Sequence, residues 1–63
     1  MCLSAVYEVR DGNESLVCEH TTGIDIDGEK ITLTDIVGEE IIIFGALTSI
    51  DLIRNIIKIN VTG

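Results

Sequence analysis

The sequence of 63 residues contains no proline and no tryptophan, and Tyr7 and Phe44 are its only aromatic residues. It has four basic residues against eleven acidic ones, so its formal net charge is −7. Nucleic-acid binding depends largely on Lys and Arg neutralising phosphates and on aromatic rings stacking against bases. This composition therefore argues against nucleic acid and against an anionic membrane surface as partners, and it favours cations.

No apolar run is long enough to cross a bilayer, because the longest covers only residues 41–47 and includes Gly45. The first twelve residues contain neither a basic leader nor a long apolar stretch, so we predict no signal peptide. Without a secretion signal, we expect the protein in the cytoplasm, with Cys2 and Cys18 reduced.

β-Branched residues dominate the chain, which has 12 Ile, 5 Val and 6 Thr but only 2 Ala. Their side chains are stiff at χ1 and suit a pleated, half-buried surface better than a helix. We therefore predict an all-β fold. The length allows one small domain, residues 1–63, which is expected to need a metal, a disulfide or a partner subunit for stability.

Turn residues divide the chain into short segments that alternate between apolar and polar residues, as strands of an antiparallel sheet do. In the first segment the residues on one face are Leu3, Ala5, Tyr7 and Val9. The expected strands cover residues 3–10, 15–20, 24–27, 29–34 and 40–44, and the expected turns are 11–14, 27–28 and 35–40. Thr21-Thr22-Gly23 predicts a kink or bulge.

Residues 40–44 are almost continuously apolar, which predicts a strand covered on both faces, and Gly45 is expected at a barrel corner. Residues 49–55 fit a helix nearly as well as a strand, but the β-branched content favours two strands that turn near Arg54-Asn55. Five or six short strands predict a small antiparallel barrel of the SH3 or Sm-like kind. The doubly apolar strand and the small core together predict a homodimer, with or without metal.

Cys2 is the residue with the most informative chemistry. An initiator Met is usually removed when the next residue is small, and the chain would then begin with Cys2. The amine and the thiolate of this cysteine can chelate one metal ion. The backbone nitrogen of Leu3 is also in reach of that ion. Two such chelates on a twofold axis supply a square-planar set of nitrogen and sulfur donors, which suits Ni(II) or Cu(II). The alternative is that Cys2 is an ordinary small apolar residue at the start of a strand.

The other candidate ligands form weaker patterns. Cys18 and His20 are two residues apart on one strand and so share a face, but two ligands do not complete a site. The acidic residues near two loops are best explained as a solvated rim; they are Asp25, Asp27, Glu29, Asp35, Glu39 and Glu40. No catalytic cysteine–histidine pair and no glycine-rich phosphate loop is recognisable, so we predict that the protein is not an enzyme.

Several segments together resemble the CooT family of small nickel-binding accessory proteins associated with carbon monoxide dehydrogenase maturation. They are Met1-Cys2-Leu3, Ile24-Asp25-Ile26-Asp27-Gly28, the segment 33–40 (LTDIVGEE), Gly45 and Ile50-Asp51-Leu52. The resemblance implies a homodimeric SH3-like domain that binds one Ni(II) per dimer through Cys2. It also implies a nickel enzyme such as carbon monoxide dehydrogenase, or its maturation factors, as partner.

Three functional hypotheses follow from the sequence. The first is a cytoplasmic Ni(II)-binding metallochaperone whose Cys2 residues meet at a dimer interface. The second is a metal-free protein-interaction module that recruits another protein through its apolar Ile41–Phe44 edge. The third, an Sm-like RNA-binding module, is disfavoured by the charge of −7.

Overall fold

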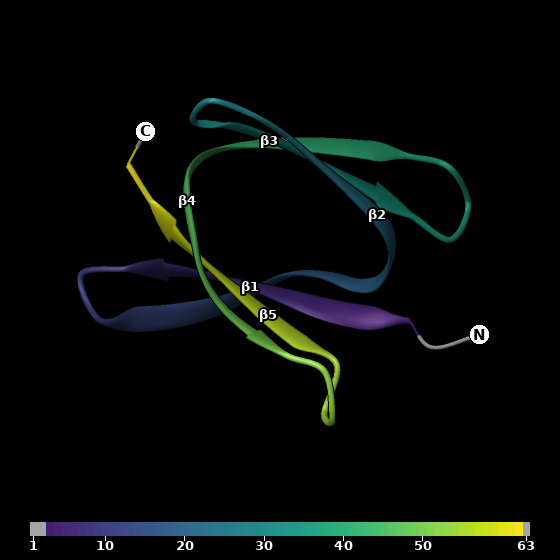
Figure 1. Cartoon of the computed structure of the whole chain (residues 1–63), viewed down its shortest axis with the longest axis horizontal. Coiled ribbons are helices and arrows are strands. Elements are labelled where there is room, and N and C mark those ends of the chain that lie inside the picture. Colours follow the sequence, from purple (N-terminus) through teal and green to yellow (C-terminus); the bar gives the residue numbers. More distant parts are fainter. Residues whose placement is uncertain (1–2, 63) are drawn as a thin grey trace.

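The computed structural model describes residues 3–62, which form five β-strands. The strands are β1 (Ser4–Arg10), β2 (Asn13–Asp27), β3 (Lys30–Asp35), β4 (Glu40–Asp51) and β5 (Ile56–Val61). Each strand pairs with the next one along the chain, and β5 pairs with β1, so the sheet closes into a barrel (Figure 1). The prediction of an all-β fold and a small barrel is confirmed. Within residues 3–62 there is no helix with the length and apolar character needed to cross a membrane.

The strand pair that closes the barrel is parallel, whereas the other four pairs are antiparallel. Strands that reverse direction at every turn leave the first and the fifth running the same way. The sequence prediction of an antiparallel barrel therefore holds for every pair except β1–β5, and the odd number of strands explains the exception.

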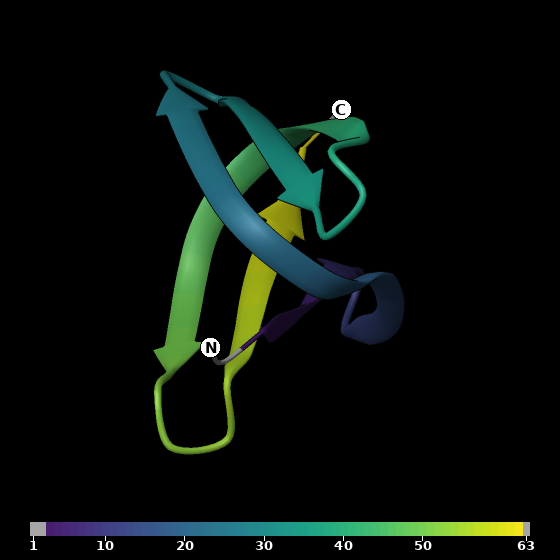
Figure 2. The ribbon, with the colours of Figure 1, turned by 90° about the vertical axis from the view of Figure 1, so that its right-hand side faces the viewer.

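β2 and β4 are long strands that each bend and pair with two different neighbours. β2 pairs with β1 up to Thr21 and with β3 from Thr21 onward. A register shift between Thr21 and Gly23 marks the predicted bulge. β4 pairs with β3 over residues 40–44 and with β5 over residues 45–51. A Cβ at Gly45 would collide with the Asn60 carbonyl oxygen, so the predicted corner requires glycine. Figure 2 shows the curvature of both strands.

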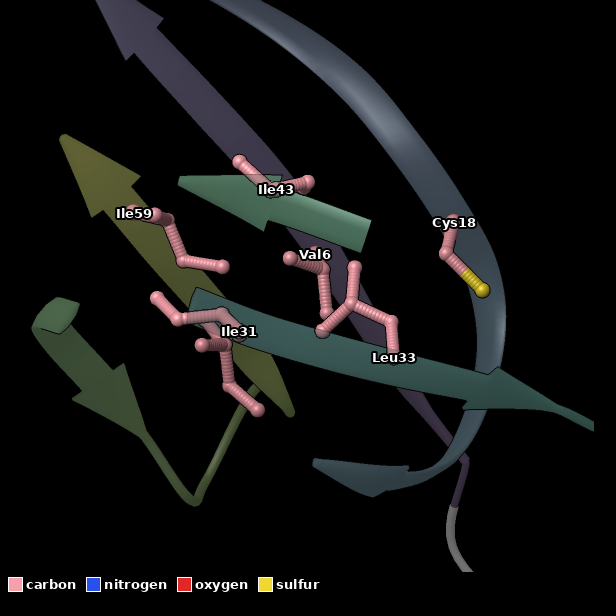
Figure 3. Packing of buried hydrophobic residues seen from close by; sticks show 7 residues of the cluster. Val6, Cys18, Ile31, Leu33, Ile43 and Ile59 are labelled. Carbon is pink, nitrogen blue, oxygen red and sulfur yellow. The ribbon is translucent and has the colours of Figure 1, made fainter. Parts of the chain in front are cut away.

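The core lies inside the barrel and is formed by seven buried apolar residues, six of which are labelled in Figure 3. The seven are Val6, Cys18, Ile31, Leu33, Ile43, Ile57 and Ile59. Ile31 and Leu33 share the inner face of β3, as predicted. In β1 the fully buried residue is Val6. The residues that were predicted to share one face of this strand are only half-buried; they are Leu3, Ala5, Tyr7 and Val9. Register shifts on both sides of Val6 interrupt the alternation on which that prediction rested.

The turns are tighter than the sequence indicated. Asp11 and Gly12 both have positive φ and form a two-residue turn, so Asn13 and Glu14 already belong to β2. The ambiguous C-terminal third consists of two strands, as predicted, and Asn55 has a φ of 57° in the turn between them.

Candidate metal centre

The proposed ligands are at the start of the chain, next to the first residue of β1. Leu3 precedes β1 and is half-buried. Cys2 lies outside the described residues, one peptide bond before Leu3. The structure therefore locates Leu3, whose backbone nitrogen is the third predicted donor, and the end of the barrel to which Cys2 is attached.

The start of β1 is held by hydrogen-bonded neighbours on both sides. Ser4 lies opposite Thr21 of β2, and Ala5 is paired with Ile56 of β5. The Ala5 N–H also donates to the Asn55 carbonyl oxygen at 2.9 Å, which ties β1 to the turn that precedes β5. The backbone of β1 is therefore held in place at Ser4 and Ala5 by both neighbouring strands.

Cys18 and His20 are not brought together as a metal site. The Cys18 side chain is 6% exposed and packs in the core opposite Val6, whereas His20 is exposed. A thiol that is packed in an apolar interior is shielded from a metal ion in solution. Within residues 3–62, no three His, Cys, Asp or Glu side chains gather in a group that could hold a metal.

The acidic side chains form an exposed rim, as the sequence predicted, with one exception. Asp35 is half-buried, and its Oδ1 accepts hydrogen bonds from the backbone N–H groups of Val37 at 3.0 Å and Glu39 at 2.9 Å. The carboxylate of Asp35 therefore holds the turn between β3 and β4 in shape. Its role in the structure is to fix this turn.

A shallow polar hollow of about 300 Å³ is lined by residues of β1, β2, β4 and β5 and of the turn between β4 and β5. Its charged groups already pair with one another. Lys58 Nζ lies 2.8 Å from Glu14 Oε2, and Arg54 Nε lies 3.0 Å from Asp51 Oδ2. These ion pairs are solvent-exposed, so they contribute little stability and they neutralise the charges that a ligand would need.

A closed barrel of five strands places the chain among the small all-β barrel domains. Residues 1–60 match the family model described as CO dehydrogenase accessory protein CooT, and the chain belongs to the CooT family. Its fold is also similar to the crystal structure of a protein from Carboxydothermus hydrogenoformans that is assigned to CooT. The TM-score is 0.87 at 19% sequence identity, over 98% of this chain and 100% of that one. No curated protein matches this chain significantly in sequence.

The sequence predicts both turns, one after Asp35 and one near Arg54-Asn55, but it places Leu52 in a strand, whereas Leu52 lies in the second turn. The sequence assigned no role to either turn. The available signal was a repeated pattern in which an aspartate is followed by two apolar residues where a turn is expected. The two instances are Asp35-Ile36-Val37 and Asp51-Leu52-Ile53.

Proposed function

We propose that this chain is a Ni(II)-binding accessory protein that carries nickel for the maturation of a nickel enzyme such as carbon monoxide dehydrogenase, and that it is not itself an enzyme. Membership of the CooT family supports the accessory role. In this proposal nickel is a cargo that is bound and released, in the cytoplasm where the thiols stay reduced.

We assign the metal-binding thiol on the basis of the burial of Cys18. The chain has two cysteines, and Cys18 is in the core with 6% of its surface exposed. Reaching Cys18 would require opening the barrel between β1 and β2. Cys2 is therefore the thiol that we assign to the metal.

The donor chemistry of Cys2 fits Ni(II). Once Met1 is removed, the amine and thiolate of Cys2 belong to one residue and form a five-membered chelate ring with the metal, and the Leu3 nitrogen is the adjacent donor. Two chains related by a twofold axis then supply a four-coordinate set of nitrogen and sulfur atoms to one ion. Because these donors must lose protons, nickel affinity is expected to fall as the pH is lowered.

The decisive experiment is a nickel titration of the chain that begins at Cys2, followed by thiolate-to-nickel charge-transfer absorption and native mass spectrometry. We expect one ion per two chains, and we expect Cys2→Ser to abolish tight binding, because a hydroxyl is a poor donor to nickel. Retaining Met1 displaces the chelating amine and should weaken binding or change the spectrum. A wild-type chain that binds no nickel would favour the metal-free interaction module instead.

A further inference from the structure

The first half of β4 carries apolar side chains on both of its faces. Ile43 is 8% exposed and is one of the core residues drawn in Figure 3, and Ile41 packs against the same core. Ile42 and Phe44 alternate with them and are 53% and 51% exposed. The sequence predicted a strand covered on both faces, but residues 3–62 form no helix or second sheet that could cover the outer pair.

The strand registers place this outer pair on a surface that extends across β2, β3 and β4. On β3, Thr32 lies opposite Ile42 and Lys30 lies opposite Phe44. On the other side of β3, Thr32 and Lys30 lie opposite two aspartates of β2. Paired residues of neighbouring strands project from the same side of a sheet. The resulting outer surface, which we call the β3 face, consists of Asp25, Asp27, Lys30, Thr32, Ile42 and Phe44.

Acidic side chains outnumber basic ones on the β3 face. Asp25 and Asp27 are exposed, and neither is in an ion pair within residues 3–62. Glu40 lies at the margin of the face, at the start of β4, and is also exposed. Lys30 is the one basic residue among them, so the surface is negative beside its apolar pair. It therefore complements a partner that combines positive charge with apolar side chains.

A second copy of the chain does not suit the β3 face. Each chain has a formal charge of −7, and two such faces packed together would bring the acidic side chains of both copies into one interface. Half-exposed Ile42 and Phe44 present roughly 150 Å² of apolar surface between them. A stable interface needs about 1,000 Å² or more in total, whereas transient complexes form at smaller ones. The size and charge of the face favour a transient complex with a different protein.

The spacing of the strands suits one helix of such a protein. Neighbouring strands are about 4.8 Å apart, so the apolar pair on β4 and the aspartates on β2 are separated by about 10 Å. An α-helix with its side chains is about 10–12 Å across. A helix that lies along β3 can therefore contact Ile42 and Phe44 with apolar side chains and reach Asp25 and Asp27 with basic ones. This is the amphipathic-helix mode of recognition.

The β3 face is remote from the segment that carries Cys2. Asp35, the last residue of β3, pairs with Thr21, which pairs with Ser4 at the start of β1. Lys30 is at the opposite end of this strand of six residues, roughly 17 Å away. A helix docked over Thr32 and Lys30 leaves the chain before Ser4 uncovered. Docking on the β3 face is thus compatible with a metal ion bound at Cys2.

We propose that the β3 face is a docking site for a basic amphipathic helix of a partner protein. The use of this site in nickel delivery rests on the proposed function, because the protein that receives nickel must bind the chain while Cys2 stays accessible. Binding of the helix does not itself require the metal. The two proposals can therefore be tested separately.

The test is a titration of the full chain, with a chelator present, into a fluorescently labelled peptide that forms a basic amphipathic helix. The peptide contains about 14 residues, all leucine or lysine, so that its helix is about 21 Å long and spans the face. We expect this peptide to bind, and a peptide with glutamate in place of lysine not to bind. NMR of the wild-type chain should show the largest amide shifts at Thr32, Ile42 and Phe44.

Paired variants distinguish the β3 face from general attraction to an acidic protein. Ile42→Thr/Phe44→Thr should raise the peptide dissociation constant at least about tenfold. Leu16→Thr is the apolar control, because Leu16 is 50% exposed and lies on the part of β2 that pairs with β1; it should change the constant less than about twofold.

Charge variants apply the same comparison to the carboxylates. Asp25→Ser/Asp27→Ser should raise the peptide dissociation constant about fivefold at ~150 mM salt. Glu8→Gln/Glu19→Gln removes the same charge from β1 and from the first part of β2, and should change it less than about twofold. Circular dichroism verifies that each variant is folded.

The inference is wrong if the lysine peptide does not bind, or if its largest amide shifts fall in the polar hollow. It is also wrong if Leu16→Thr weakens binding as much as Ile42→Thr/Phe44→Thr does. Sedimentation supplies another test: if Ile42→Thr/Phe44→Thr turns a dimer into a monomer, a second copy occupies the face. The NMR map uses the wild type, so it decides the question even where a variant fails to fold.

Nickel titration separates this inference from the proposed function. Ile42→Thr/Phe44→Thr should lose the peptide and bind nickel like the wild type. A wild type that binds the peptide but no nickel would refute the proposed function and leave the docking site standing. A wild type that binds nickel but not the peptide would refute the docking site alone.

Discussion

Val6 lies directly opposite Cys18 in the ladder between β1 and β2, and both side chains are buried in the core. Cys18 is thereby a packing residue, although it is one of only two thiols in the chain. Cys18 therefore has a structural role in the barrel.

Substitution of Cys18 should change stability and leave nickel binding intact. Cys18→Ser places a hydroxyl against Val6, and a buried hydroxyl without a partner lowers the free energy of unfolding by about 1–3 kcal/mol. Cys18→Ala removes the sulfur without adding a polar group and should cost less. Urea unfolding at a fixed protein concentration measures both effects.

The nickel titration of Cys18→Ala should reproduce the wild-type stoichiometry and charge-transfer spectrum. Loss of nickel binding in a folded Cys18→Ala protein would show that the metal is bound through the core strand, and the assignment to Cys2 would be wrong. His20→Ala serves as a further control, since His20 is the only histidine and is exposed.

Gly45 should tolerate no side chain. At this position β4 leaves β3 and joins β5, and a Cβ would meet the backbone of Asn60 and Val61. A backbone carbonyl cannot move aside as a flexible side chain can, so Gly45→Ala should lower the free energy of unfolding by about 2 kcal/mol or more. Thermal unfolding of the purified variant is the measurement.

Gly23 provides the matched control, because it lies at the other bend and has open space around it. The nearest atom to a Cβ there is Thr34 Cβ at 3.9 Å, an ordinary contact distance. Gly23→Ala should leave stability unchanged or raise it by up to about 1 kcal/mol, since alanine restricts the unfolded chain. Equal destabilisation by the two substitutions would contradict the steric argument.

The sequence predicted the parts of the fold that depend on local chemistry. Gly45 and the Thr21–Gly23 segment were recognisable as bends, because glycine and a broken alternation leave a local signal. The burial of Val6 was not predictable, because it depends on register shifts that arise only when β1 is inserted between β2 and β5. Long-range pairing set that register, and no local pattern encodes it.

The candidate site could be predicted from the sequence only in part. Cys2 was identified from its position in the chain, and its placement stays a prediction because it lies outside the described residues. Both turns were predicted, but the second one begins earlier than expected, since Leu52 and Ile53 match the alternation of a strand until the Asp51 hydrogen bonds are seen. The hydrogen bond from Ala5 to Asn55 in the β4–β5 turn depends on the closure of the barrel, which joins residues far apart in the sequence.

Salt should strengthen the proposed homodimer, because both copies are strongly acidic. Each chain has a formal charge of −7, so two copies repel each other at low ionic strength. Raising sodium chloride from about 20 to about 500 mM screens this repulsion and should lower the dimer dissociation constant roughly fivefold. Analytical ultracentrifugation across the series measures it. A dimer that weakens as salt is added would instead depend on ion pairs between the copies.

Acid should loosen the turn between β4 and β5 by protonating Asp51. Hydrogen bonds from the backbone N–H and the side chain of Arg54 lower the pKa of Asp51 below its ordinary value of 3.8. A carboxylate whose pKa is depressed in the folded state contributes stability above its unfolded pKa. That contribution disappears as the pH falls through the folded pKa, so the turn should be intact at pH 5 and should loosen only below pH 3.8.

Amide resonances of Ile53 and Arg54 report on this titration, because both N–H groups donate to Asp51 Oδ1. Their chemical shifts, followed by NMR from pH 7 to pH 2, should share a midpoint below 3.8. Asp51→Asn keeps an acceptor oxygen without a titrating charge, so its spectra should lack this transition while the barrel stays folded. A wild-type midpoint at or above 3.8 would show that the Arg54 contacts do not stabilise the carboxylate in solution.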